Sequence, residues 1–225
     1  MSTKQDTRDR LIETARQLFL KKGYTATGVA EILETAGLNA GSLYHFFPTK
    51  DDLLLAVLER YKELLGPCVL EPVFSRIADP TERVFGILEG YRRMLLETDH
   101  EHGCPIGNLA LELSTTHPAA RKVIAENFTG WRNAVADCLR QAAGRLPAGL
   151  DVDQLALFVL TLMEGAVMLA RAYRAVEPYD AAVAQLRDYF DRLLSDETTL
   201  PTERSAARTT KQKKRRRRNV RTQAR

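Results

Sequence analysis

The chain has 225 residues, of which 44% are hydrophobic, and its 33 Lys and Arg against 29 Asp and Glu give a formal net charge of +4. This hydrophobic content excludes a wholly disordered protein and predicts a buried core. The first ten residues are polar, and the three cysteines are an odd number, which argues against a secreted disulfide scaffold and favours a cytoplasmic protein. The longest apolar run, Leu155 to Met163, is too short to span a bilayer.

Helical periodicity dominates the chain, and no segment has the alternation of a strand, so the sequence predicts an all-α fold of about nine helices. The predicted helices span residues 8–23, 28–37, 40–47, 49–65, 79–97, 105–114, 118–144, 152–174 and 179–194. The residues expected to cap their N-termini are Thr27, Asn39, Thr49, Asp79, Cys104 and Asp151. Gly23 and Gly37 are placed to end the first two helices.

The second and third predicted helices are joined by the tight turn AGLN. Such a turn makes the two helices cross steeply, which is typical of a helix-turn-helix, and Gly37 suits the positive φ that the turn needs. The residues with inner-face spacing are Ile32, Ala36, Leu38, Leu43 and Phe46. The residues left on the exposed side of the second helix are Ala40, Gly41, Ser42, Tyr44 and His45.

The segment TARQLFLKKGYTATGVAEILETAGLNAGSLYHFFPTKDDLLLAVLE, with its core AGLxxGSLYHFFxxK, resembles the DNA-binding domain of the tetracycline-repressor (TetR) family. The resemblance implies an all-helical homodimer whose second helix-turn-helix helix enters the major groove of a double-stranded DNA operator. It also implies a larger C-terminal domain that binds a ligand and dimerises. We therefore expect a DNA-binding domain at 1–50, a regulatory domain at 51–196 and a basic tail at 197–225.

The resemblance also implies which residues meet DNA. They are Thr27, Gly28, Val29, Asn39, Ala40, Gly41, Ser42, Tyr44, His45 and Lys50. Among them, Thr27 and Val29 would meet phosphates at a helix N-terminus, and Lys50 would bind a further phosphate. Ala30 and Ala40 depart from the family pattern, which often has a basic residue at position 30 and Lys or Pro at position 40, and both departures remove candidate base contacts.

The positive charge is concentrated at the end of the chain. Eleven Lys and Arg but one acid lie from Glu203 onward, so residues 1–202 carry a net charge of −6. Residues 1–60 hold eight basic and eight acidic side chains, so the DNA-binding domain is expected to attract DNA phosphates only weakly. The tail is expected to be disordered, and it is either a non-specific nucleic-acid-binding arm or simply a solvated segment.

The last two predicted helices are apolar around more of their girth than one intramolecular face needs. In the resemblance they pair with their copies to form a four-helix dimer interface; an ordinary core is the alternative. The expected interface residues are Phe158, Leu162, Gly165, Ala166, Leu169, Leu186 and Phe190. A symmetric dimer would read a palindrome.

The middle helices are expected to enclose a pocket for a small-molecule effector. The candidate lining residues are Tyr91, Met94, Ile106, Leu109, Leu113, Phe128, Trp131 and Val135. Few charges interrupt these helical faces, which favours an apolar or aromatic effector over a sugar or nucleotide. No cofactor is expected.

Cys104 lies between Gly103 and Pro105, where the helix dipole is expected to lower the pKa of its thiol. The segment GCPIGNLALELS also resembles the sensor region of a TetR branch that responds to electrophiles and quinones. Two interpretations stay open: a thiol sensor for an electrophilic effector, and a helix cap beside a reversibly bound ligand. Cys68 and Cys138 have apolar sequence neighbours and are expected to be inert.

A metal site and an enzyme are weaker alternatives. His100, His102 and Cys104 fall short of the four ligands of a structural site, and nothing marks an oxyanion hole, so we expect neither metal binding nor catalysis. The sequence therefore predicts a cytoplasmic, homodimeric transcriptional regulator, most simply a repressor, with no membrane partner. An activator and a non-specific architectural DNA-binding protein are the alternatives within DNA binding.

Overall fold

The structure, a computed structural model, describes residues 3–195, and side chains from Lys4 onward. The basic tail expected at 197–225 lies outside the described residues. Within residues 3–195 every regular element is helical, which confirms the all-α prediction. Nine α-helices in this range have seven or more residues, in agreement with the expected number.

The helices follow the predicted order. The N-terminal part contains α1 (Thr3–Lys22), α2 (Val29–Ala36), α3 (Ala40–Phe46) and α4 (Lys50–Leu64). A π-helical turn, η1 (Leu65–Leu70), and the one-turn α5 (Glu71–Phe74) come next. The remaining elements are α6 (Pro80–Glu97), α7 (Pro105–Leu113), α8 (Pro118–Gln141), the 3₁₀ turn η2 (Ala143–Arg145), α9 (Val152–Tyr173) and α10 (Glu177–Ser195).

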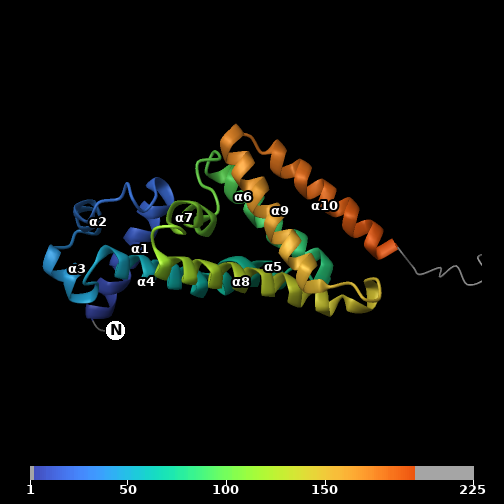
Figure 1. Cartoon of the computed structure of the whole chain (residues 1–225), viewed down its shortest axis with the longest axis horizontal. Helices are drawn as coiled ribbons and strands as arrows, with labels where there is room; N and C mark the ends of the chain where they lie inside the picture. Colours follow the sequence, from blue (N-terminus) through green and yellow to red (C-terminus); the bar gives the residue numbers. More distant parts are fainter. Residues whose placement is uncertain (1–2, 196–225) are drawn as a thin grey trace, which may run out of the picture.

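Helices α1, α2 and α3 form a head at one end of the molecule (Figure 1). Ile32 from α2 and Leu43 from α3 are fully buried in it, and α1 contacts both helices. Gly37 ends α2 in the left-handed region with φ 61°, as the tight turn requires. Asn39 caps α3 as predicted, because its side chain accepts a hydrogen bond from the amide of Ser42 at 2.9 Å.

The other predicted caps are confirmed with one exception. Thr49, Asp79 and Asp151 each accept hydrogen bonds from the first turn of the following helix. Thr27 does not cap α2, because its buried hydroxyl donates back to the carbonyl of Gly23 at 2.7 Å. Gly28 occupies the cap position instead and makes no side-chain cap hydrogen bond.

The segment after α4 differs from the sequence prediction. The predicted helix ended at residue 65, whereas the chain remains helical through η1 and α5. Pro67 and Pro72 have no amide hydrogen, so neither can complete an ordinary i to i−4 ladder. The wider π turn and the short α5 accommodate both prolines without ending the helical path.

Helices α8 and α9 are the central pair of the regulatory part. α8 contacts α4, α6, α7 and α9, and α10 lies along the outer side of α9 (Figure 1). Val135 from α8 and Val159 and Met163 from α9 are fully buried in this core. The head and α10 lie at opposite ends, so α4, α7 and α8 provide the connections between them.

Candidate DNA-binding face and regulatory cavity

Helix α3 presents an exposed face on the head. Ala40, Gly41, Tyr44 and His45 are exposed and Ser42 is half-buried, while Leu43 faces the core. A groove of about 470 Å³ follows this face and is lined by Lys4, Thr7, Asn39, Gly41, Ser42, His45 and Phe46. Sequence reasoning missed Lys4 and Thr7, because it began the first helix at residue 8 rather than at Thr3.

Two of the residues expected to meet phosphates, Thr27 and Lys50, have hydrogen-bond partners within the chain. The hydroxyl of Thr27 is already used within the chain, as described above. Lys50 turns its ammonium inward, where Nζ donates to the carbonyl of Tyr24 at 2.6 Å and lies 4.0 Å from the centre of the Tyr24 ring. Burial lowers the pKa of Lys50, although Glu112 and Asp51 oppose this. Gly28 is exposed and Val29 half-buried beside this turn.

One side of α9 carries an exposed apolar surface. Phe158 and Leu169 are 48% and 43% exposed, and Leu162 and Gly165 between them are half-buried. Leu157, Met168, Tyr173 and Tyr189 are also exposed, and the Tyr189 ring lies 6.1 Å from that of Phe158. We call the exposed set Leu157, Phe158, Met168, Leu169, Tyr173 and Tyr189 the α9–α10 face.

Three residues expected at the dimer interface are instead core residues of one chain. Ala166, Leu186 and Phe190 are buried, the last two to 1% exposure. Phe190 packs edge-on against Phe85 of α6, with ring centres 5.3 Å apart. Helical periodicity shows that α9 and α10 have two apolar sides but not which side faces inward.

Among the described helices, α9 alone is long and apolar enough to cross a membrane by length and composition. This corrects the prediction that the apolar run is too short, because the run resumes after Glu164 and continues to Ala170, within a helix that ends at Tyr173. One side of α9, including Leu155 and Val159, is buried against the rest of the protein. The apolar composition of α9 is therefore also that of a core helix with a second apolar side.

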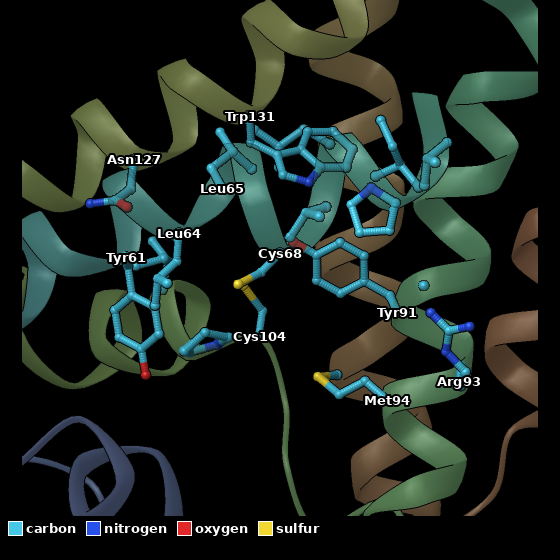
Figure 2. Close-up of a pocket in the computed structure, with 18 of the residues that line it drawn as sticks. Tyr61, Leu64, Leu65, Cys68, Tyr91, Arg93, Met94, Cys104, Asn127 and Trp131 are labelled. Atoms are coloured by element: carbon cyan, nitrogen blue, oxygen red, sulfur yellow. The ribbon is translucent and has the colours of Figure 1, made fainter. Parts of the chain in front are cut away.

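A cavity of about 560 Å³ lies between the head and the regulatory helices (Figure 2). Five of the eight predicted lining residues border it, namely Tyr91, Met94, Ile106, Phe128 and Trp131, and so does the predicted sensor Cys104. Leu109, Leu113 and Val135 do not border it, and all three are buried in the core.

Two walls of the cavity were missed from the sequence. Tyr61 of α4 and Cys68 of η1 line one side, and Figure 2 shows them facing the same space as Tyr91 and Trp131. Helix α1 adds Glu13, Arg16 and Leu20, so the head itself forms part of the wall. No sequence signal pointed to α1, because its apolar stripe is fully explained by packing within the head.

Cys104 caps α7 as predicted, with Sγ accepting a hydrogen bond from the amide of Gly107 at 3.5 Å. The expected lowering of its pKa is wrong. Burial first, and then the charge of Glu164, raise the pKa of the thiol well above its ordinary value, and the amides of Gly107 and Ile106 offset only part of this. The thiol therefore stays protonated at neutral pH and is a weak nucleophile.

The other two cysteines differ from each other. Cys68, expected to be inert, is exposed and lines the cavity together with Cys104. Cys138 is buried, and burial raises the pKa of its thiol. Among residues 3–195 no group of three or more His, Cys, Asp and Glu side chains is placed to hold a metal.

Glu164, in the middle of α9, is the functional candidate that the sequence did not reveal. Its carboxyl lines the cavity and hydrogen-bonds the thiol of Cys104. Its Oε2 lies so close to Gly107 that a Cβ at that position would overlap it. Its Oε1 is buried and has no hydrogen-bond partner among the described residues. Burial raises the pKa of this carboxyl, and the Cys104 thiol partly opposes that rise.

Glu112 joins the regulatory part to the head. From the last turn of α7, its carboxylate accepts hydrogen bonds from the amides of Tyr24 at 2.9 Å and Thr25 at 2.6 Å, in the turn between α1 and α2. Burial alone would raise its pKa, but the hydrogen bonds from Thr25 and Tyr24 and the charge of Lys50 hold it below the usual value. The hydroxyl of Tyr24 also donates to Asp51 of α4.

Two family models match the chain. Residues 11–57 match the model described as bacterial regulatory proteins, tetR family. Residues 80–186 match the model described as tetracyclin repressor-like, C-terminal domain. The first match contains the part of the groove that Asn39 and α3 form, and the second contains Cys104, Glu112 and Glu164.

Known relatives cover most of the chain. An HTH-type transcriptional regulator of Mycobacterium tuberculosis is 30% identical over 82% of this chain and 94% of its own length. The HTH-type transcriptional repressor DhaR of a Mycobacterium species is 29% identical over 77% of this chain and 86% of its own length. The reduced form of Escherichia coli NemR has a similar crystal structure, with a TM-score of 0.72, 28% identity, and coverage of 81% of this chain and 96% of that one.

Proposed function

The chain belongs to the tetR family of bacterial helix-turn-helix transcriptional regulators, and we propose that it is a repressor that a small molecule releases from its operator. One observation carries the release mechanism: the cavity that would hold the effector has α1 of the head in its wall. An occupant of the cavity therefore acts directly on the element that supports α2 and α3.

Operator binding is assigned to the exposed face of α3. The first turn of α3 carries Ala40, Gly41 and Ser42, whose small side chains let the helix backbone approach base edges closely. Tyr44 and His45 are exposed beside them, where they can contact the sugar–phosphate backbone. The proposed role of the basic tail is to add sequence-independent affinity for phosphates.

The homodimer is assigned to the α9–α10 face. Monomeric proteins seldom expose a contiguous apolar surface of this kind without a partner. A two-fold axis through α9 and α10 would place the two heads at the outer ends of the dimer, and two identical heads read a palindromic site. We place this dimer in the cytoplasm, where the operator is.

Release requires the effector to bind one conformation of the dimer better than the other. Only the difference between its two affinities can shift the population away from the conformation whose heads fit the operator. A coupling of about 2 to 4 kcal/mol, or roughly 30- to 1000-fold in affinity, is sufficient. The two routes from cavity to head are the α1 wall and the contact that Glu112 makes with the turn after α1.

A thiol sensor acting through Cys104 is the second candidate, and one observation favours it: Cys68 and Cys104 line the same cavity. The raised pKa of the Cys104 thiol argues against direct attack on an electrophile. We therefore prefer reversible binding. The reported relatives are all named as transcriptional regulators, and we propose no enzymatic activity for this chain.

The test uses the full chain and the DNA upstream of its own gene. We expect a footprint with two-fold symmetry, lower transcription in vitro as protein is added, and an operator affinity at least about tenfold weaker for Tyr44→Ala. Leu96→Ala, at another exposed large apolar residue, is the matched control and should bind as wild type. Higher transcription would identify an activator. Equal binding to unrelated DNA would identify an architectural protein.

A further inference from the structure

The cavity is predominantly apolar but contains one deeply placed acid. Its depth is formed by rings and aliphatic chains, including Tyr91, Trp131 and Met94, which Figure 2 shows around a common space. Glu164 enters this wall from α9, and its Oε1 is shielded from solvent without a hydrogen-bond partner among the described residues. A buried acceptor that lacks a donor costs about 1 to 3 kcal/mol, and more when it is charged. A ligand that supplies a donor recovers that cost.

No basic side chain in the described part of the chain forms an ion pair with Glu164. The three arginines of the cavity wall have other contacts. Arg16 donates to Glu13 at 2.8 Å, and Arg76 donates to the carbonyl of Pro72 at 2.7 Å. Arg93 lies 3.9 Å from Glu97 and is 57% exposed. The carboxyl of Glu164 is therefore the one charge-bearing group of the inner wall that no cation of residues 3–195 neutralises.

Aromatic rings complete a site suited to a cation. The rings of Tyr91 and Trp131 meet edge to face with centres 6.4 Å apart, whereas the Tyr61 ring already has the guanidinium of Arg16 5.6 Å from its centre. The faces of such rings attract an organic cation, especially where water is excluded. A volume of about 560 Å³ accommodates a compact ligand with an apolar body.

From this arrangement we infer that the effector is a lipophilic organic cation: an amine whose ammonium group pairs with Glu164 and whose apolar body lies against the rings of Tyr91 and Trp131. A carboxylate ligand would meet Glu164 without a free arginine to compensate, and a hydrocarbon would leave Oε1 without a donor. This inference rests on the proposed function, because it names the ligand class of the same cavity.

The test compares three ligands that share one apolar body: 4-phenylbutylamine, 4-phenylbutanol and 4-phenylbutyrate. Trp131 is the single tryptophan of the chain and lines the cavity, so its selectively excited fluorescence reports binding of all three. We expect the amine to bind at least about tenfold more tightly than the alcohol, a difference of about 1.4 kcal/mol, and the carboxylate to bind most weakly. Glu164→Gln keeps the size of the side chain and should remove most of the amine's advantage.

Glu89→Gln is the matched control, because Glu89 also lines the cavity but its side chain is 65% exposed. It should keep the preference for the amine. The inference is overturned if wild type binds none of the three ligands, if the alcohol or the carboxylate binds as tightly as the amine, or if Glu164→Gln keeps the full preference.

Operator anisotropy, measured in parallel on the same samples, separates this inference from the proposed function. If the amine binds and the operator is released, both the inferred ligand class and the proposed function are supported. If the amine binds with the expected preference but the operator stays bound, the ligand class stands and release by the cavity fails. If the dimer binds its operator but shows no preference for the amine, the repressor stands and the inference fails.

Discussion

The contact between Glu112 and the head can be tested by truncating its side chain. Glu112→Ala removes both hydrogen bonds to the turn between α1 and α2. A hydrogen bond to a charged group contributes about 1.5 to 3 kcal/mol, but the Thr25 amide is exposed and can bind water instead. We therefore expect a loss of about 2 kcal/mol in the free energy that holds the turn closed, mostly from the Tyr24 amide.

Hydrogen exchange measures this quantity directly, without an effector. A loss of about 2 kcal/mol should speed exchange of the amides at Tyr24 and Thr25 about 30-fold under conditions where opening is at equilibrium. Glu112→Gln keeps one acceptor oxygen and should show about half the loss in free energy, or roughly a fivefold change. Glu97→Ala, at an exposed glutamate that ends α6, should leave both amides unchanged.

Unchanged exchange at Tyr24 and Thr25 in Glu112→Ala would show that other contacts hold the turn and not Glu112. Lys50 and Asp51 are the candidates for those contacts, because both hydrogen-bond Tyr24 from the first turn of α4. If exchange does rise as expected, the same variant should also lose part of the response of operator binding to an occupant of the cavity.

Three further predictions concern other parts of the molecule. The lowered pKa of Glu112 means that its stabilising contribution is complete above about pH 4.5 and is lost as the pH falls through the lowered value. Urea unfolding should therefore show a smaller loss of stability in acid for Glu112→Gln than for wild type, and an equal loss would contradict this. N-ethylmaleimide should modify exposed Cys68 before buried Cys104, as peptide mass spectrometry can determine, and the reverse order would revive the thiol sensor. Leu169→Glu should yield a folded monomer by light scattering and circular dichroism, whereas a persistent dimer would place the interface elsewhere.

Local chemistry made most of the helices predictable. A cap such as Asn39 or Thr49 acts within three residues, so its hydrogen bond depends on sequence neighbours alone. Thr27 failed as a cap because its hydroxyl donates to a nearby backbone carbonyl, that of Gly23, and does not accept from an amide of α2. Helix continuation across Pro67 was missed because a π turn is a rare solution that the sequence does not distinguish from a helix end.

The site was less predictable, because its groups come from distant parts of the chain. Tyr91 and Trp131 were expected at the cavity because they belong to the middle helices, but nothing local relates Glu164 to Cys104, which lie 60 positions apart in the sequence. The same limit applies to Lys50, whose family role at a phosphate gave no sign of its contact with Tyr24. Tertiary packing, not propensity, decides which charged groups are enclosed.

The two ends of α7 lie at the cavity and at the head, which are the two places that the proposed ligand-controlled repressor must connect. In its first turn, Gly107 packs so closely against Glu164 that movement of that carboxyl toward a ligand cannot leave the backbone contact unchanged. In its last turn, Glu112 holds the turn that precedes α2. A helix of nine residues is about 13 Å long and stiff, so a small rotation at one end displaces the other. Because Glu112 holds backbone amides and not a mobile side chain, such a displacement acts on the position of α2, and through it on the angle at which α3 is presented.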